Sequence, residues 1–460
     1  MKSRLLYLQQ ALSQPWSSRN KWMAIFFALA ILTLPLQIKI NVFEVPWGRG
    51  FANPYTTIWI SLSEIFLFAS ATLFFLKHLL EKTKIQTGDN GFFILLLGGL
   101  TISTISLLLS PLQDPSFHFL LFIKLLSLLI LYLLVVNKVL RAHTILEIFI
   151  LTMGFQAILA ILQVILQSSI GLQFLGEPFL SEQVPHIARF SLGGMKIIRG
   201  YGTFSHPNVL GGFLVVSLLA SLLFSPQLKS ERSLLLAIQF LGLLASFSRS
   251  AMLALTVALA IITFWYLKEI RKNKIIPIAL GVLIFGELAF ISISRGFNLL
   301  QDNAFLERIK GFGQSWAIFQ EYPLGVGFNH FTLFLDPISK TPLSPWDYQP
   351  VHNILMIGLS EAGIIGLIGM IIAVFYVFHK THKNRKNFLT PNRNFKKRIL
   401  LVIFVSLLFI GLFDHYLITL DQGRFLLILI FAIASRFSAN PRYVLPLRRG
   451  ENWKQILAGQ

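Results

Sequence analysis

Arg249 lies in a Ser248-Arg249-Ser250 turn between two long apolar runs, where a charged side chain is uncommon. Two structural explanations are open: the guanidinium could extend to the membrane surface, or it could bond to the last carbonyls of the preceding helix. A chemical explanation is open as well, because the planar guanidinium fork matches the oxygens of a phosphate. Arg249 is therefore a candidate for binding a lipid-linked phosphate at the depth of the headgroups.

A second candidate segment, residues 199–208, reads Arg-Gly-Tyr-Gly-Thr-Phe-Ser-His-Pro-Asn and leads into an apolar run. Its two glycines let the backbone approach a ligand, and Asn208 suits a helix N-cap, whose helix terminus favours anions. From its placement, Arg199 is a candidate for contact with a phosphate or sugar. The alternative is a tight glycine-rich turn that binds nothing.

His352 and Asn353 stand at the start of another apolar run, directly after a long loop. A neutral imidazole there could remove a proton from an attacking hydroxyl, or it could only cap a helix or form a hydrogen bond at the interface. Glu361 follows nine positions later (361 − 352), which on a helix is about two and a half turns, on the opposite face. We therefore expect no direct His–Glu pair, and we keep Glu361 as a secondary candidate because an acid within a membrane span is costly.

The sequence lacks the residues that several kinds of catalytic or binding site require. The chain has no cysteine, which excludes disulfides and thiolate nucleophiles. It has no D-x-D or E-x-x-H arrangement for a divalent cation and no P-loop for a nucleotide. We expect neither a metal nor a cofactor, so arginines would have to take the place of a metal ion beside a phosphate.

Long apolar runs recur along the whole chain. Of its 460 residues, 55% are hydrophobic and 13% are charged, against a charged fraction of about 25% in a soluble domain. The runs that approach the length of a membrane-spanning helix lie near residues 22–38, 57–76, 91–110, 118–137, 144–167, 208–224, 233–247, 250–267, 275–293, 353–378, 398–413 and 422–436. The sequence predicts an all-α transmembrane bundle of about 12 spans, and one integral membrane domain over residues 1–460.

The basic residues predict how these spans are oriented. The net charge is +20, and most of the cations fall in alternate loops, such as Lys77 to Lys84 and Lys380 to Arg398. By the positive-inside rule these loops are cytoplasmic, as are both termini of this multi-pass chain. Because Arg199, Arg249 and Arg308 fall on the other side, the candidate site is expected at the outer face of the cell (inner) membrane.

Two outer loops, residues 168–206 and 295–352, are longer than a connection needs. The second loop contains Trp316 and Trp346 with further aromatic residues, so we expect it to be ordered. Apolar residues recur at helical spacing over residues 304–320, which predicts a short amphipathic helix in this loop.

Short motifs in the second half of the chain follow an order that is found in a known family. They are the run at residues 202–208, the Ser248-Arg249-Ser250 turn, Arg308, Trp316, the segment at residues 321–331 (Glu-Tyr-Pro-Leu-Gly-Val-Gly-Phe-Asn-His-Phe), and His352-Asn353 followed by Glu361, Gly363 and Gly366. In these motifs the chain resembles the O-antigen ligase/polymerase family, membrane glycosyltransferases that use undecaprenyl-diphosphate-linked glycans. Ser250 departs from the pattern, because the family often has glycine after the arginine.

The resemblance implies a ligase-like glycosyltransferase of cell-envelope polysaccharide biosynthesis. It would move a glycan from an undecaprenyl-diphosphate donor to an acceptor hydroxyl, without a metal and with inversion at the anomeric carbon. The family's two arginines and one histidine fall on Arg249, Arg308 and His352, which implies that the guanidinium groups stabilise the diphosphate leaving group while the imidazole deprotonates or orients the acceptor. The other candidate binding residues are Arg199, His206, Asn208, Asn353 and Glu361.

Two alternatives remain. A polymerase of the same family would use the same donor chemistry, and the acceptor could be a lipid, a glycan or a protein. A transporter or flippase of lipid-linked glycans would place ionisable residues near the middle of the membrane. Here the candidate residues cluster at the outer edge, and Lys124 and Glu361 are the only clear charges within spans. Besides these substrates we expect membrane lipids as partners, and no nucleic acid.

Overall fold

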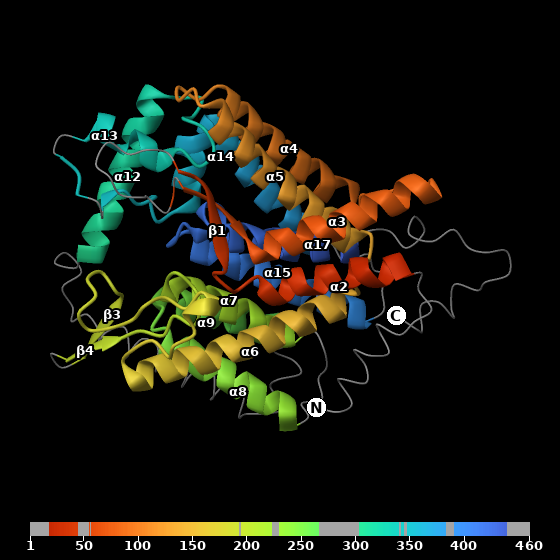
Figure 1. Cartoon of the computed structure of the whole chain (residues 1–460), viewed down its shortest axis with the longest axis horizontal. Coiled ribbons are helices and arrows are strands. Elements are labelled where there is room, and N and C mark those ends of the chain that lie inside the picture. Colours follow the sequence, from red (N-terminus) through yellow and green to blue (C-terminus); the bar gives the residue numbers. More distant parts are fainter. Residues whose placement is uncertain are drawn as a thin grey trace.

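The chain folds mostly into long helices that pack side by side (Figure 1). The computed structural model describes residues 18–44, 55, 57–192, 195–222, 230–265, 303–339, 342–344, 347–382 and 391–438. The long helices are α2 (Ser18–Thr33), α3 (Leu62–Glu81), α4 (Asn90–Leu108), α5 (Pro115–Val136), α6 (Ala142–Leu166), α7 (Pro207–Ser221), α8 (Ser230–Ala245), α9 (Arg249–Trp265), α14 (Ile354–His382), α15 (Pro391–Gly411) and α17 (Asp421–Ser438).

These helices occupy the expected apolar runs, except that the run near residues 275–293 lies outside the described residues. Within the described ranges, α3, α4, α5, α6 and α14 are long and apolar enough to cross a membrane, judged by length and composition. Four further apolar helices, α2, α7, α8 and α9, are shorter. The structure thus confirms a mostly helical protein with five candidate membrane-spanning helices among the described residues, while the count of about 12 spans stays a prediction.

Two short hairpins add a little strand to this mostly helical fold. Strand β1 (Lys39–Glu44) pairs with β2 (Thr57–Ser61), and β3 (Arg189–Leu192) pairs with β4 (Met195–Ile198), both antiparallel. The run expected as a span from residue 57 therefore begins as a strand. It turns helical at Leu62 because Ser61 and Glu64 form a capping box: Ser61 Oγ accepts from the Glu64 N–H at 3.2 Å, and Glu64 Oε2 accepts from the Ser61 N–H at 2.9 Å.

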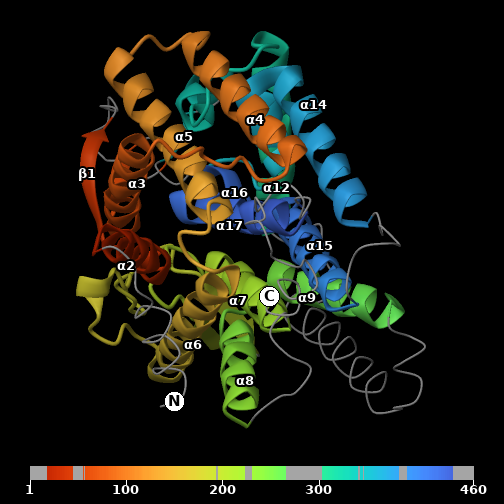
Figure 2. The same cartoon turned by 90° about the vertical axis from the view of Figure 1, so that its right-hand side faces the viewer.

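The C-terminal helices lie in the middle of the bundle. Figure 2 shows α15 and α17 between a group formed by α4, α5 and α14 and a second group formed by α6 to α9. A single turn of helix, α16 (Tyr416–Thr419), lies between them in the chain. The connection at residues 412–420 is therefore placed to reach both groups of helices.

The long loops gather at one end of the bundle (Figure 1). They carry η1 (Gln173–Leu175), the β3–β4 hairpin, α12 (Asn303–Glu321), η3 (Phe331–Phe334) and α13 (Leu335–Ile338). Helix α12 confirms the amphipathic helix predicted at residues 304–320, and it lies crosswise to α2 and α6 (Figure 1). The turn between α4 and α5 reaches the same loop, because Ser110 Oγ donates to the Val326 carbonyl at 2.6 Å.

Lys124, expected as a charge within a span, is paired inside the bundle. Its Nζ lies 2.6 Å from Glu64 Oε2 and 2.8 Å from Asp421 Oδ2, and Asp421 Oδ1 also contacts Arg424 Nη2 at 3.0 Å. These residues come from α3, α5 and α17. The network fastens the start of α17 to the N-terminal helices, because removing one partner would leave a buried charge without compensation.

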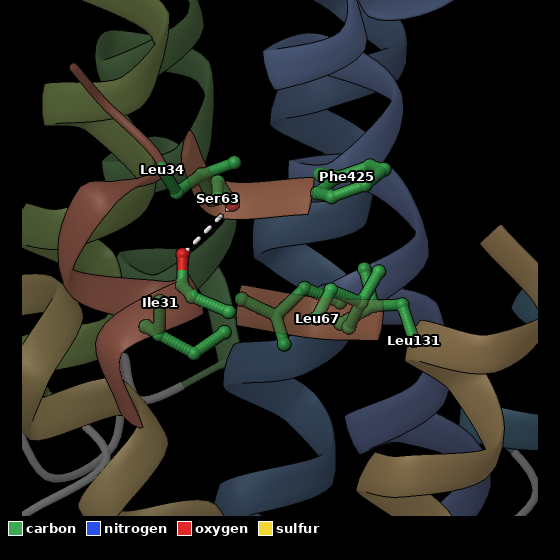
Figure 3. Close-up of a pocket in the computed structure, with 8 residues that line it drawn as sticks. Ile31, Leu34, Ser63, Leu67, Leu131 and Phe425 are labelled. Atoms are coloured by element: carbon green, nitrogen blue, oxygen red, sulfur yellow. Dashed lines mark hydrogen bonds between the residues drawn. The ribbon is translucent and has the colours of Figure 1, made fainter. Parts of the chain in front are cut away.

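A small apolar cavity lies between α2, α3, α5 and α17 (Figure 3). Its lining consists of Ala30, Ile31, Leu34, Ser63, Leu67, Leu131, Phe425 and Leu429. The one polar side chain among them, Ser63, donates its hydroxyl to the Ala30 carbonyl at 2.8 Å (Figure 3). Since no charged group lines this cavity, it does not fit a diphosphate.

Candidate functional site

The first helix of the site, α7, begins at Pro207, and His206 is its N-cap. Nδ1 of His206 accepts a hydrogen bond from the Asn208 N–H at 3.1 Å, and Pro207 suits the first helical position because that position needs no N–H. The prediction that Asn208 caps this helix was therefore wrong. The cap position falls two residues earlier, which frees the Asn208 amide for other contacts.

Asn208 links two distant parts of the chain. Its Oδ1 accepts from Arg199 Nη2 at 2.7 Å, and its Nδ2 donates to Asp414 Oδ2 at 2.9 Å. Arg199 also donates from Nε to the Ser246 carbonyl at 2.8 Å. The 199–208 segment is thus bonded both to the turn that carries Arg249 and to the 412–420 connection. Two of the N–H donors of Arg199, on Nε and Nη2, are used in these structural hydrogen bonds.

Arg249 is the first residue of α9 and is partly exposed. The turn before it packs closely on α7, since a Cβ added to Gly211 would lie 2.8 Å from Ser248 Cβ and 3.1 Å from Ser246 Oγ. Gly211 therefore allows the turn to approach α7. Through the bond from Arg199 to Ser246, Arg249 is held at the same end of the bundle as Asn208 and Asp414.

Three imidazoles gather around Asp414. The ring centroids of His352 and His415 are 5.0 Å apart in an edge-to-face arrangement, and Tyr55 contacts His415 in the same way at 5.4 Å. Asp414 Oδ1 accepts from the His415 N–H at 2.8 Å. Since His206 and His352 also interact electrostatically with this carboxylate, the site joins residues from α7, α14 and the 412–420 connection.

Burial decides the charge states of these groups. It lowers the pKa of His352, although the Asp414 carboxylate partly opposes the shift, so the imidazole is neutral at pH 7 and able to accept a proton. Burial also lowers the pKa of His415, to about 3. Burial alone would raise the pKa of Asp414, but His415, His352, His206 and the Asn208 amide outweigh it and hold that pKa below the usual range. Asp414 is therefore a carboxylate facing neutral rings.

Arg308 approaches the same connection from α12. Its Nη2 donates to the Phe413 carbonyl at 3.3 Å, and the guanidinium carbon lies 5.9 Å from the centre of the Phe413 ring. Burial lowers the pKa of Arg199 to about 10, which leaves it a cation at neutral pH. The site therefore combines guanidinium groups with a neutral imidazole and a carboxylate.

Asn353 orients the residue next to it. Its Oδ1 accepts from the Leu355 and Met356 N–H groups at 2.9 and 3.1 Å, and so caps the start of α14. Its Nδ2 donates to the Leu412 carbonyl at 3.1 Å. Asn353 thus fixes both the helix that follows His352 and the connection that bears Asp414, which is a positioning role.

Glu361 serves a different segment. Its Oε2 and Oε1 accept from the Asn329 and Phe331 N–H groups at 2.9 and 3.3 Å, so it holds the 323–331 loop. Two residues later Gly363 has φ +64° and interrupts α14, and beyond it the Ile364 N–H donates to the Pro323 carbonyl at 3.3 Å. Glu361 also lines a small cavity together with Tyr55 and Thr419. Both of these residues contact His415.

Sequence reasoning missed Asp414, His415 and Tyr55. Asp414 and His415 lie in a short connection between two apolar runs, and the available signal was a pair of ionisable residues in such a connection. In the part of the chain that the structure describes, no group of three or more His, Cys, Asp or Glu side chains is placed to hold a metal ion.

A family model described as O-antigen ligase matches residues 234–371. The matched segment contains Arg249, Arg308, His352 and Glu361, whereas Arg199, Asn208 and Asp414 lie outside it. No curated protein matches the chain. Over residues 234–371 the chain is therefore similar to the O-antigen ligase family.

Proposed function

We propose that this protein is a ligase-like membrane glycosyltransferase, which moves a glycan from an undecaprenyl-diphosphate donor to an acceptor hydroxyl at the outer face of the cell membrane. The family match supports glycosyl transfer in polysaccharide biosynthesis. The observation that carries the proposal is the neutral His352 imidazole beside the Asp414 carboxylate, with Arg308 reaching the adjoining Phe413 carbonyl.

In the proposed reaction the acceptor oxygen attacks the anomeric carbon from the face opposite the diphosphate. The new C–O bond forms as the bond from that carbon to the diphosphate oxygen breaks, which inverts the anomeric centre. The acceptor proton passes to His352, and Asp414 stabilises the resulting imidazolium. The leaving undecaprenyl diphosphate gains negative charge, which Arg308 and Arg249 stabilise with fixed cationic donors.

A polymerase would use the same residues on the same donor and differ only in its acceptor, a second lipid-linked glycan. Transport without chemistry fits less well, because Lys124 is bonded to Glu64 and Asp421 and Glu361 accepts loop amides. A transport pathway would instead need ionisable groups that are accessible to the substrate.

The test uses the full chain in vesicles with an undecaprenyl-diphosphate glycan, candidate acceptors and EDTA. We expect covalent transfer that survives chelation and falls by roughly 10²–10⁴ in His352→Ala, the usual range for a general base. His143→Ala is the matched control, because the His143 side chain is about half exposed and pairs with Glu147 four residues along its own helix. Equal activity in His352→Ala and the control would overturn the mechanism, and movement of the donor across the membrane with no covalent product would favour a flippase.

A further inference from the structure

Helix α12 presents three different faces. With 100° per residue, Gly311, Ser315 and Ile318 share one face, which packs against the protein. Ile318 is fully buried, Ser315 Oγ donates to the Met356 carbonyl at 3.4 Å, and a Cβ on Gly311 would lie 3.1 Å from Val351 Cγ2. This face holds α12 against the start of α14.

A second, polar face follows around the helix. It carries Glu307, Lys310 and Gln314, which lie within about 60° of one another at the same angular step. Lys310 Nζ forms an ion pair with Asp347 Oδ1 at 2.8 Å. This polar and charged face is suited to contact with water.

The third face is apolar and exposed. It consists of Leu306, Ile309, Phe312 and Trp316, whose spacing of three, three and four residues places them along one side of the helix. Their exposed fractions are 47, 52, 39 and 52%, so these large side chains do not pack into the protein. We call these four residues the apolar stripe.

The apolar stripe continues into the outward surface of α14. Exposed Leu324 follows α12, and its backbone carbonyl carbon lies 2.6 Å from where a Cβ on Gly363 would stand. Directly after Gly363, α14 exposes Ile364, Ile365, Ile368 and Ile372. Because α14 is long and apolar enough to span a membrane, its exposed isoleucines are the kind of surface that lipid chains cover.

We infer that α12 is an interfacial helix whose apolar stripe is immersed in the acyl chains of the outer leaflet. Three observations carry this: the separation of an apolar from a polar face on one helix, the continuity of the stripe with the exposed surface of α14, and the crosswise course of α12 at the end of the bundle (Figure 1). A helix with these faces lies in the plane of the membrane interface, where Trp316 is a preferred anchor.

Immersion of the apolar stripe also sets the depth of Arg308 in the membrane. On the helical wheel Arg308 lies between the packed face and the apolar stripe, about 40° from Phe312. An immersed stripe holds this guanidinium at the level of the lipid headgroups, where the diphosphate of a lipid-linked donor also lies. This consequence rests on the proposed function, whereas the lipid contact does not.

The natural chain has no cysteine, so single cysteines report on single positions without further changes. Ile309→Cys, Phe312→Cys and Trp316→Cys would each carry a nitroxide label in the full chain, reconstituted in vesicles of phosphatidylethanolamine and phosphatidylglycerol. Collisions with oxygen, which concentrates in lipid, are compared with collisions with a water-soluble nickel chelate. Ile372→Cys on α14 is the lipid reference, and Glu307→Cys, on the polar face of the same helix, is the matched control.

We expect the ratio of oxygen to nickel collisions at the three stripe positions to be several-fold above that at Glu307→Cys and to approach that at Ile372→Cys. A ratio equal to the control would place the stripe in water and overturn the inference. Labels shielded from both reagents would overturn it too, because the stripe would then be covered by protein. The measurement needs no substrate, so its outcome is independent of whether glycosyl transfer is observed.

Discussion

Asn208 and Asp414 are joined by a hydrogen bond of 2.9 Å from the amide Nδ2 to the carboxylate Oδ2. The two residues are 206 positions apart: Asn208 lies in α7, and Asp414 lies in the connection between α15 and α16. The bond leaves Asp414 ionised and fixed beside His352, and the Asn208 amide is itself held by Arg199. Each element of the proposed site therefore depends on a contact with another part of the chain.

Asp414→Asn tests this dependence. The amide keeps the size of the side chain and removes the charge that stabilises a protonated His352, so we expect transfer to fall by roughly 10²-fold or more. Since Asp414 raises the pKa of His352 against the effect of burial, the acid limb of the pH–rate profile should also move to lower pH. Measuring kcat/KM across pH checks both effects, and a profile with an unchanged limb would contradict the assigned contact.

Arg308→Ala should weaken transfer by roughly 10²-fold, because one fixed cationic donor to the leaving diphosphate is lost. Arg308→Lys keeps the charge but not the planar fork, so we expect it to recover part of the activity. Arg189→Ala is the control: Arg189 Nη2 donates to the Glu182 and Val184 carbonyls at 2.6 and 3.1 Å, within its own loop. Initial rates measured with the lipid-linked donor compare the three variants. Equal losses of activity in Arg308→Ala and Arg189→Ala would argue against a specific role for Arg308.

The stability of the protein should fall in acid. Burial holds the pKa of His415 at about 3, whereas an unfolded histidine titrates near about 6.5. Between these values the unfolded chain binds more protons at His415, so the contribution of this histidine to stability is fully present above about pH 6.5 and is lost as the pH falls, by about 1.4 kcal/mol per pH unit at most. Asp414, whose pKa is also lowered, acts in the same direction at lower pH.

Thermal unfolding in detergent, followed by tryptophan fluorescence from pH 8 to pH 5, measures this effect. His415→Gln should flatten the acid side of the curve, and His143→Gln should leave it unchanged. If His415→Gln kept the full dependence on pH, another group would have to account for it.

Gly363→Ala should destabilise the protein. Gly363 has φ +64° and ψ −162°, a region that only glycine adopts readily, and a Cβ there would lie 2.3 Å from the Pro323 carbonyl oxygen. A cost of ~1–3 kcal/mol is expected from the backbone conformation alone. Gly369→Ala on the same helix is the control, because its nearest neighbour is the end of the Ile102 side chain at 3.2 Å. The melting temperatures of Gly363→Ala and Gly369→Ala measure the difference. Equal values would mean that α14 can become a continuous helix at this position.

Much of the fold could be predicted from the sequence because the determinants are local. Long apolar runs predict helices wherever they occur, and the apolar spacing at residues 304–320 predicted α12. The β1–β2 hairpin was missed because residues 57–61 are as apolar as the helix that follows, and only the Ser61–Glu64 capping box separates them. The N-cap of α7 was misplaced because Asn208 and His206 can both accept a backbone N–H.

The site was predicted where a residue stands in a recognisable motif. Arg249, Arg308 and His352 were named in this way, and whether they act as proposed stays a prediction. Asp414 and His415 could not be found, because their importance depends on packing. Since α15 and α17 occupy the middle of the bundle, the 412–420 connection between them lies against His352. The contact between Asn208 and Asp414 likewise has no local signal.

The position of Asp414 has a consequence for biosynthesis. The segment matched by the family model ends at residue 371, and Asp414 follows 43 residues later (414 − 371). A ribosome that has completed the whole matched segment has therefore not yet made the carboxylate to which Asn208 binds. Since α15 and α17 lie in the centre of a bundle whose other long helices precede them in the chain, the insertion of these last helices completes the site, and a nascent chain stays without it until then.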